Sequence, residues 1–287
     1  MRMAMVRQLA GQFPVRALCR ALGVSRAAFY AGVTKPARPR AAENARLWVK
    51  IHECFEASHR TYGSPRLTAA LRRSGESCSR HRVARIMRGR GLRAKQKRRF
   101  RPRTTDTNHL CPIAPNRLAA RAAPPTRPDE VWAADITYVP TGEGWLYVAG
   151  VLNLYSRKLV GWAAEDAMPT ALVARAFSRA VAQRRPATGL LHHSDRGSQY
   201  ASDAYRLLLH QHGVQTSMSR AGNCYDNAFM ESFWATTKTE LLQGRVFHTH
   251  AEAKSALFSS FEVFYNRRRL HGALGFQSPV DYENNPG

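Results

Sequence analysis

The pattern of apolar and polar positions changes near residue 129. On the N-terminal side, apolar residues recur three and four positions apart, the spacing of helices that bury one face. On the C-terminal side, compact apolar runs bounded by turn residues are typical of strands. The predicted strands are 131–139, 145–153, 158–165, 189–195 and 214–219, and the predicted helices among and after them are 169–183, 202–212, 229–242 and 251–266.

The order of these later elements is three strands, helix, strand, helix, strand and helix. Short turns join the first three strands, which makes them antiparallel neighbours, whereas the strand–helix–strand connections imply right-handed crossovers. This is the order of the ribonuclease-H-like fold. We predict an α/β domain over residues 129–245, with a mixed five-stranded sheet and flanking helices, followed by a C-terminal helix and basic tail over 246–287.

An all-α unit is predicted over residues 1–32. One helix ends at Gly23, and Ser25 caps a second short helix that starts with the exposed Arg26. Helix, turn and capped helix is the helix-turn-helix pattern, and a plain helical hairpin is the alternative. We favour DNA binding because Arg26 begins the second helix.

A second helix-turn-helix-like unit is predicted over residues 43–93, after a Pro/Ala/Arg linker at 33–42. Ser64 is expected to cap one helix, with Pro65 at its first position, and Ser79 is expected to cap the next. The last helix carries only basic charges, whereas a solvated face normally mixes both signs, so we predict nucleic-acid contact. Its candidate contacts are Arg80, Arg82, Arg85 and Arg88.

Residues 94–128 contain six prolines and show no sustained periodicity. We interpret them as an extended basic linker, able to follow a DNA groove and to become ordered on binding. The candidate DNA contacts in this linker are Lys95, Lys97, Arg98, Arg99 and Arg101.

The net charge of +24 is concentrated in the first part of the chain. Residues 1–123 hold 28 Lys and Arg against 5 Asp and Glu, whereas residues 124–287 hold 16 against 15. Such a charge indicates a polyanionic partner, either nucleic acid or an acidic membrane surface. No apolar run is long enough for a membrane span, the start does not resemble a signal peptide, and the five cysteines are scattered. DNA in a reducing cytoplasm is the expected setting.

Three carboxylates lie in unexpected surroundings. Asp135 sits inside an apolar strand, Asp195 directly follows the fourth strand, and Glu231 lies in an apolar-aromatic helix. Each alone has an ordinary explanation, such as an arginine partner, a turn cap or a surface position. Together they provide the hard oxygen ligands with which two divalent cations are held for phosphoryl transfer on DNA.

The spacing of these carboxylates resembles the DDE signature of a known family. Between Asp135 and Asp195 lie 59 residues, and between Asp195 and Glu231 lie 35. With WAADITYV, HHSDRGSQY and NAFMESFWATTKTE around them, they resemble the IS-three family of insertion-sequence transposases, specifically its second-frame (OrfB) product. RTYGSPRL and YNRRRLHGALGFQSPVDY match the family too, so the resemblance covers essentially the whole chain. Retroviral integrases share the catalytic core.

The resemblance implies a DNA transposase that cuts at the ends of its element and joins them to target DNA. Asp135, Asp195 and Glu231 would be the catalytic residues and would hold two Mg²⁺ ions, for which Mn²⁺ can substitute. Lys238, two helical turns after Glu231, would contact a DNA phosphate, and a surface ion pair is its alternative. Family relatives work with an upstream-frame, OrfA-like subunit, and we expect a homo-oligomer on the DNA.

Further residues near this site are candidates for metal binding or DNA contact. Asp226 and Glu240 are rivals for the third ligand and rank below Glu231. The loop at 219–227 is expected to close over DNA as a lid. Further candidate DNA contacts are Asn223, Asn227, Arg267, Arg268 and His271. The alternatives to a transposase are a ribonuclease-H-like nuclease or resolvase and a non-catalytic DNA-binding regulator.

Overall fold

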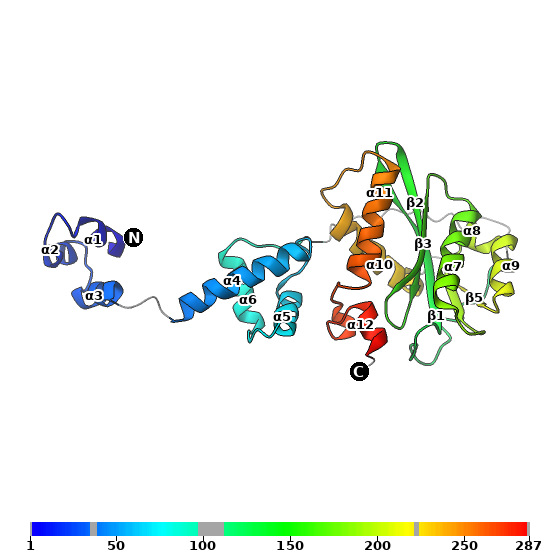
Figure 1. Ribbon diagram of the computed structural model, residues 1–287, viewed down its shortest axis with the longest axis horizontal. Helices are drawn as coiled ribbons and strands as arrows, with labels where there is room; N and C mark the ends of the chain where they lie inside the picture. The colour runs from blue at the N-terminus through cyan, green and yellow to red at the C-terminus, as the bar shows by residue number, and fades with distance from the viewer. Residues whose placement is uncertain (1, 35–38, 97–111, 221–223, 286–287) are drawn as a thin grey trace.

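The computed structural model describes residues 2–34, 39–96, 112–220 and 224–285 (Figure 1). One five-stranded sheet forms the centre of the C-terminal domain, in the order β3-β2-β1-β4-β5. The strands are β1 (Val131–Thr141), β2 (Gly144–Asn153), β3 (Leu159–Glu165), β4 (Leu191–Ser194) and β5 (Gln215–Met218). β1, β2 and β3 are antiparallel neighbours, and β4 runs parallel to both β1 and β5. The predicted mixed sheet is therefore confirmed.

Helices cover both faces of this sheet (Figure 1). Alternate residues of β1 point to opposite faces, so that Val131 and Ala133 enter one apolar cluster and Trp132 and Ala134 enter the other. The first cluster includes α10 (Ala228–Thr237), α11 (His250–Phe258) and the π-helical turn η3 (Ser259–Tyr265). The second includes α7 (Thr170–Arg184), α8 (Ser198–Ala201) and α9 (Asp203–Gln211).

Close packing fixes α7 against β3. A Cβ atom added to Gly161 would collide with the backbone oxygen of Ala176 and would lie 2.7 Å from the backbone nitrogen of Ala180. Glycine at this position therefore allows the helix to lie directly on the strand.

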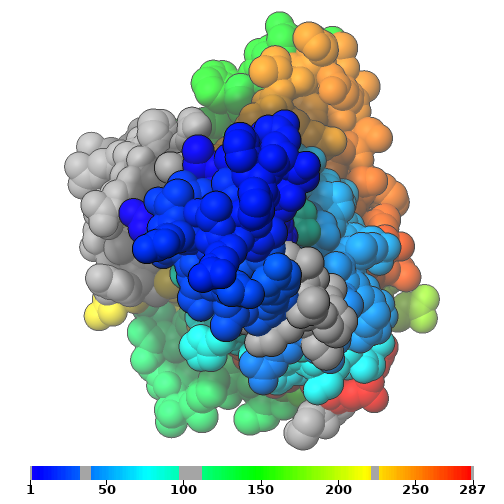
Figure 2. All heavy atoms as spheres, turned by 90° about the vertical axis from the view of Figure 1, so that its left-hand side faces the viewer, coloured from blue at the N-terminus to red at the C-terminus, as the bar shows by residue number. Residues whose placement is uncertain are grey.

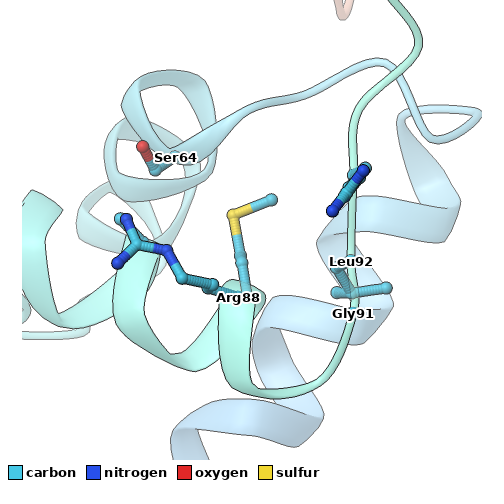
Figure 3. Close-up of a pocket in the computed structure, with 7 residues that line it drawn as sticks. Ser64, Arg88, Gly91 and Leu92 are labelled. Carbon is cyan, nitrogen blue, oxygen red and sulfur yellow. The ribbon is translucent and has the colours of Figure 1, made fainter.

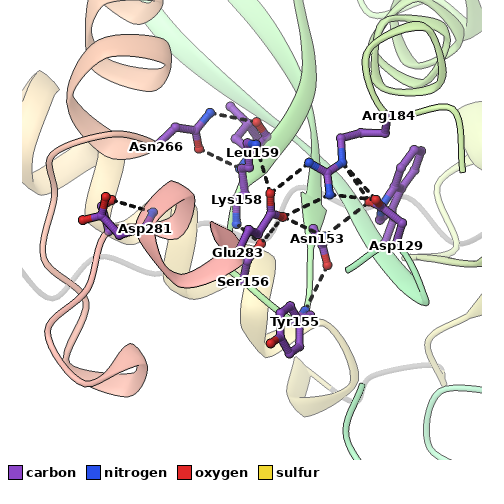
Figure 4. Close-up of polar contacts among 12 residues, drawn as sticks. Asp129, Asn153, Tyr155, Ser156, Lys158, Leu159, Arg184, Asn266, Asp281 and Glu283 are labelled. Atoms are coloured by element: carbon purple, nitrogen blue, oxygen red, sulfur yellow. Dashed lines mark hydrogen bonds and ion pairs between the residues drawn. The ribbon is translucent and has the colours of Figure 1, made fainter. Parts of the chain in front are cut away.

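The C-terminal segment is tied to the sheet by a buried polar network (Figure 4). This C-terminal segment contains the 3₁₀ turn η4 (Gly272–Leu274) and α12 (Pro279–Asn284). Glu283 accepts hydrogen bonds from Lys158, Arg184 and Ser156 at 2.8–3.2 Å. Arg184 also donates to both carboxylate oxygens of Asp129. The last helix is thus fixed to the start of the sheet and to α7.

Three helices at the N-terminus form an apolar cluster of their own. They are α1 (Arg2–Leu9), α2 (Val15–Ala21) and α3 (Arg26–Thr34). Val6, Leu18, Cys19 and Phe29 form the buried centre. The sequence predicted α2 and α3, and the Ser25 hydroxyl caps α3 by accepting from the backbone of Ala28 at 3.3 Å. α1 was not predicted.

The second helical unit begins earlier than predicted. Its helices are α4 (Pro39–Ala57), α5 (Ser64–Arg73) and α6 (Arg80–Gly89). Residues 33 and 34 belong to α3 and residues 39–42 to α4, so these parts of the expected linker at 33–42 are helical. The cap expected at Ser64 is wrong, because Gly63 occupies the N-cap and no side chain caps the helix. Ser79 does cap α6.

This second unit packs against the C-terminal segment of the chain. Leu47, Leu67 and Val83 share one apolar cluster with Phe264 and Leu270, whose side chains are 8% and 5% exposed. The sequence did not predict this contact, since the two segments lie at opposite ends of the chain. In Figure 2, which faces the N-terminal side, α1–α3 lie in front of α4–α6.

Residues 112–128 of the predicted linker contact the catalytic domain. The Ser217 hydroxyl accepts hydrogen bonds from the backbone of Arg117 and Leu118 at 3.0 and 3.2 Å. Asn116 donates to Asp226 at 2.8 Å, and Leu118 packs on the sheet. These contacts place residues 116–118 against the catalytic domain. No helix of the described residues is long and apolar enough to cross a membrane.

The two histidines of β4 occupy opposite faces, as the strand period predicts. His192 is 1% exposed among Phe177, Tyr200 and Tyr205, and its Nε2 lies 3.0 Å from the Tyr205 hydroxyl. Burial, with a smaller contribution from the charge of His193, lowers the pKa of His192 from 6.5 to about 3.

Acid is therefore expected to destabilise the protein through His192. The unfolded chain takes up a proton below pH 6.5 and the folded chain does not, so stability falls as pH decreases from 6.5 towards 3. We expect His192 to account for a loss of about 2 kcal/mol between pH 6.5 and 5. Urea unfolding at both pH values checks this. His192→Gln should reduce the pH dependence of the free energy of unfolding. His210 is exposed, so an equal reduction in His210→Gln would contradict the assignment to His192.

Candidate active site and DNA-binding surface

Asp135 lies on the central strand at the point where one neighbour ends. β4 pairs with β1 from Val131 to Ala133 only, so Asp135 is just beyond the paired part. On its other side, Asp135 is paired with Gly150 of the antiparallel strand β2. One Asp135 carboxylate oxygen accepts a hydrogen bond from the backbone of Ile136 at 2.9 Å. The sheet therefore holds this carboxylate near an open strand edge.

Parallel register brings Asp195 to the same level. Ala133 is opposite His193, so the chain positions of Asp135 and Asp195 correspond on neighbouring strands. Asp195 follows the last residue of β4, at the carboxyl end where α/β sheets commonly bind ligands. Its Oδ1 accepts from the backbone of Gly197 at 2.9 Å. The two aspartates predicted from the sequence are thus adjacent.

Glu231 and Lys238 come from the helix that covers this face of the sheet. A Cβ atom added to Gly150 would lie 3.0 Å from the Trp234 ring, so the glycine permits α10 to approach β2 closely. Glu231 is exposed in the first turn of α10. The Lys238 ammonium lies 4.8 Å from the centre of the Tyr138 ring.

The electrostatics of Asp135 link all four groups. Burial raises the pKa of Asp135 well above its ordinary value of 3.8, and the charges of Asp195 and Glu231 raise it further. The backbone of Ile136 and the Lys238 ammonium oppose this rise. Burial lowers the pKa of Lys238, while Asp135 raises it. The site therefore has an excess of negative charge that a bound cation would neutralise.

The donor chemistry of this site suits a hard divalent cation, because carboxylate oxygens are the ligands that Mg²⁺ prefers. Within the described residues, however, no group of three or more His, Cys, Asp or Glu side chains is arranged to hold a metal ion. The sheet positions the two aspartates, whereas Glu231 lies on the separate helix α10.

The rivals for the third ligand have other partners. Both Glu240 carboxylate oxygens are bound by Arg269 at 2.7 Å. Asp226 is bound by Arg220 and Asn116, and its pKa is lowered, first by the hydrogen bond from Arg220. Both carboxylates are neutralised by protein groups, which supports ranking them below Glu231 as the third ligand.

The predicted DNA-contact residues fall into three sets. Exposed residues that remain suitable are Arg26, Arg80, Arg85, Arg88, Arg267 and Arg268. Residues engaged or covered by the protein are Arg82, which binds Asn44 and Glu43, Lys95, which donates to the backbone of Glu240, Asn227, which is 6% exposed, and His271. Burial and the nearby charge of Arg269 lower the pKa of His271 to about 2, so it is neutral. Residues outside the described part of the chain are Lys97, Arg98, Arg99, Arg101 and Asn223.

A hollow of about 400 Å³ lies beside the exposed arginines of the second helical unit (Figure 3). It is lined by Ser64 at the start of α5, by Arg88 in α6, and by Gly91, Leu92 and Arg93 beyond it. Cationic side chains and the first turn of a helix attract phosphate groups. This surface therefore agrees with a nucleic-acid partner for the unit.

Sequence reasoning missed two aromatic residues at the site. Tyr138 lies under the Lys238 ammonium, and Tyr200 is 2% exposed near both aspartates. The Tyr200 hydroxyl has no hydrogen-bond partner among the described residues. Burial, followed by the charge of Asp135, raises the pKa of Tyr200. Both tyrosines lie within the motifs around Asp135 and Asp195, and that proximity in sequence was the available signal.

Adjacent carboxylates on β1 and directly after β4, with Glu231 in α10 and Lys238 just after it, are typical of an integrase-type polynucleotidyl transferase. The chain matches a family model for the integrase core domain over residues 125–224 and a second one over residues 212–279. It also matches a model for an HTH-like domain over residues 42–100. The chain is a DNA transposase and belongs to the insertion-sequence transposases of the IS-three family.

Relatives along nearly the whole chain establish this membership. An uncharacterized 31 kDa protein of insertion element IS600 from Shigella sonnei is 44% identical over 92% of this chain and 97% of its own length. The transposase of insertion sequence element IS904 from Lactococcus lactis is 40% identical, covering 82% of this chain and 92% of its own. Transposase InsF of insertion sequence IS3A from Escherichia coli is 36% identical, covering 95% of each. Among solved structures, a chain of a simian T-cell lymphotropic virus intasome aligns with 82% of this chain and 75% of its own at a TM-score of 0.49 and 12% identity.

Proposed function

We propose that Asp135, Asp195 and Glu231 are the catalytic carboxylates and that together they hold two Mg²⁺ ions, which Mn²⁺ can replace. The observation that carries the proposal is the matched register of Asp135 and Asp195, with a pKa of Asp135 that both other carboxylates raise. When bound, the cations would activate a water or DNA 3′-hydroxyl nucleophile and stabilise the leaving oxygen.

The side chains of this site have distinct tasks in the proposal. Asp135 and Asp195 are fixed by the sheet and by backbone N–H donors, so that they present oxygens in a constant geometry. Glu231 completes the set from α10. Lys238, held beside Asp135 over the Tyr138 ring, binds a phosphate of the scissile strand. The excess negative charge would otherwise repel that strand, and Lys238 offsets part of this repulsion.

We further propose that the substrates are the terminal repeats of an insertion element and a target DNA. The exposed arginines of the helical units would bind the repeats, because residues 1–123, which contain these units and their basic linkers, carry nearly all of the net charge. A homo-oligomer would bring two ends together, and an upstream-frame subunit would assist in recognising them. The protein would act in the bacterial cytoplasm, associated with the nucleoid.

Metal dependence tests the proposed chemistry. Mg²⁺ and Mn²⁺ are expected to support cleavage and strand transfer on paired element ends. Ca²⁺ is expected to permit DNA binding without chemistry, because its loose coordination does not maintain an in-line geometry. The measurement is product formation on labelled DNA, with gel-shift binding in parallel as the control. Full activity with a strong chelator would exclude the two-metal mechanism.

A further inference from the structure

A part-buried ionic cluster is centred on Glu240, just beyond the end of α10. Glu240 belongs to the π-helical turn η2 (Lys238–Leu242), which continues α10. Arg269 donates to both Glu240 carboxylate oxygens at 2.7 Å, and its side chain is only 5% exposed. Arg66 of α5 lies 3.4 Å from one of the same oxygens. Lys95 donates to the backbone oxygen of Glu240 at 3.0 Å.

The same cluster joins three parts of the chain that are far apart in sequence. The Tyr62 hydroxyl accepts from the backbone of Leu270 at 2.7 Å and donates to the backbone oxygen of Arg268 at 3.2 Å. The Arg66 guanidinium lies 5.7 Å from the centre of the Tyr62 ring. The RTYGSPRL motif of the second helical unit therefore meets the RRRLHG motif of the C-terminal segment at Glu240.

The contacts of Glu240 give it a role outside the proposed metal site. Lys238 lies seven residues after Glu231, about two α-helical turns, and therefore on the same face of the helix. Glu240 lies beyond the end of α10 in the π-helical turn, where Arg269 binds both of its carboxylate oxygens. Because only one residue separates Glu240 from Lys238, fixing Glu240 also fixes Lys238 and the end of α10. Arg66 of the second helical unit, and Lys95 of the linker that follows it, thus connect this part of the chain to the helix that carries Glu231.

We propose that Glu240, Arg66 and Arg269 are positioning residues, through which DNA held by α4–α6 sets Lys238 and Glu231 against Asp135 and Asp195. The proposal rests on the proposed roles of those four residues. Arg66 and Arg269 both contact the Glu240 carboxylate, and all three side chains are largely shielded from solvent. A shielded ionic network restricts the positions of its side chains more than an exposed ion pair does. DNA bound to the helical unit would then favour the aligned position of α10.

Arg66→Gln tests this proposal in the full chain. The substitution removes the link from α5 but leaves the Glu240–Arg269 pair intact. We expect the affinity for element-end DNA to stay within about twofold, while the single-turnover rate of strand transfer from pre-cleaved ends falls about tenfold or more, as for small misplacements of reacting groups. Arg73→Gln is the matched control, because Arg73 also lies on α5 and reaches the C-terminal segment at Asp281, 3.4 Å away. Arg73→Gln is expected to match the wild type in both measurements.

A double variant separates positioning from stability. Glu240→Met with Arg269→Met replaces the whole buried pair, which commonly preserves folding. We expect a melting temperature close to that of the wild type and a strand-transfer rate that is still reduced. A wild-type rate in Arg66→Gln, or a rate loss explained fully by weaker DNA binding, would overturn the proposal. A wild-type strand-transfer rate in the double variant would also overturn the proposal. Asp135→Asn, assayed alongside, reports separately on the proposed catalytic site, because this substitution leaves the contacts of Glu240 with Arg66 and Arg269 unchanged.

Discussion

Asp135→Asn is expected to abolish strand transfer and to raise the melting temperature of the metal-free protein. The substitution keeps the volume of the side chain but removes the charge that would hold metal. We expect the rate to fall at least about a thousandfold, as for other residues that act as a catalytic unit. Asp195→Asn and Glu231→Gln should lose activity to a similar extent.

The gain in stability follows from the raised pKa of Asp135. The unfolded chain loses this proton near pH 3.8, whereas burial and the neighbouring carboxylates make the charged form unfavourable in the folded chain. Stability from this group is therefore lost as pH rises above 3.8, whereas asparagine does not titrate and causes no such loss. Active sites commonly show this conflict between stability and function.

Two measurements on each variant check this prediction: strand transfer on end DNA with Mg²⁺, and thermal unfolding in a chelator. Asp203→Asn is the control, because its side chain is 93% exposed, and it should change neither. Asp226→Asn is expected to be milder than the triad variants, since Asp226 is bound by Arg220 and Asn116. Near-wild-type activity in any triad variant would remove that residue from the ligand set.

The fold was predictable where a periodic pattern determines a local element. The apolar run of β1 and the short turns to β2 and β3 predict three antiparallel strands, and the helical crossover predicts a parallel β4. α1 was missed because its apolar side is small: only Val6 is buried in it. The cap at Ser64 failed because Pro65 fits the first turn of a helix equally well one position later, with Gly63 as the N-cap.

Some features of the candidate site could be predicted from the sequence and others could not. Asp135 and Asp195 could be grouped from the sequence because their spacing and surrounding motifs resemble the DDE signature, and the register of β1 and β4 then shows them at the same level. The contacts of Glu240 could not be predicted, since Arg66 and Arg269 lie 174 and 29 residues away from it, and no local pattern specifies such pairs. His271 was predicted to bind DNA from its basic neighbours, whereas tertiary packing places it against Arg269 and Tyr265. Charge in the sequence does not distinguish a solvated side chain from a partnered one.

Deletion of the first helical unit and deletion of both units are expected to differ in their effects on folding stability and on DNA binding. Deleting residues 1–34 should leave the rest of the chain folded, because α1–α3 have an apolar cluster of their own. Deleting residues 1–123 retains every strand, and the sequence alone favours independent folding of the remainder. The structure indicates otherwise, since the loss of α4–α6 exposes Phe264 and Leu270, each worth about 1.5–3 kcal/mol when buried.

Salt dependence of DNA binding should follow the charge that each deletion removes. The logarithm of affinity falls with the logarithm of salt concentration at a slope of about −0.9 per neutralised phosphate. Residues 1–34 carry 5 arginines of the 28 basic residues in residues 1–123, so the first deletion should reduce the slope slightly. The second should remove most of the slope and all preference for element ends, because the predicted base-reading helices are gone. Fluorescence anisotropy with end and random DNA across a salt series, with thermal unfolding of each protein, measures both effects. Equal slopes in the full chain and in residues 124–287 would show that the catalytic domain, and not the helical units, supplies the DNA affinity.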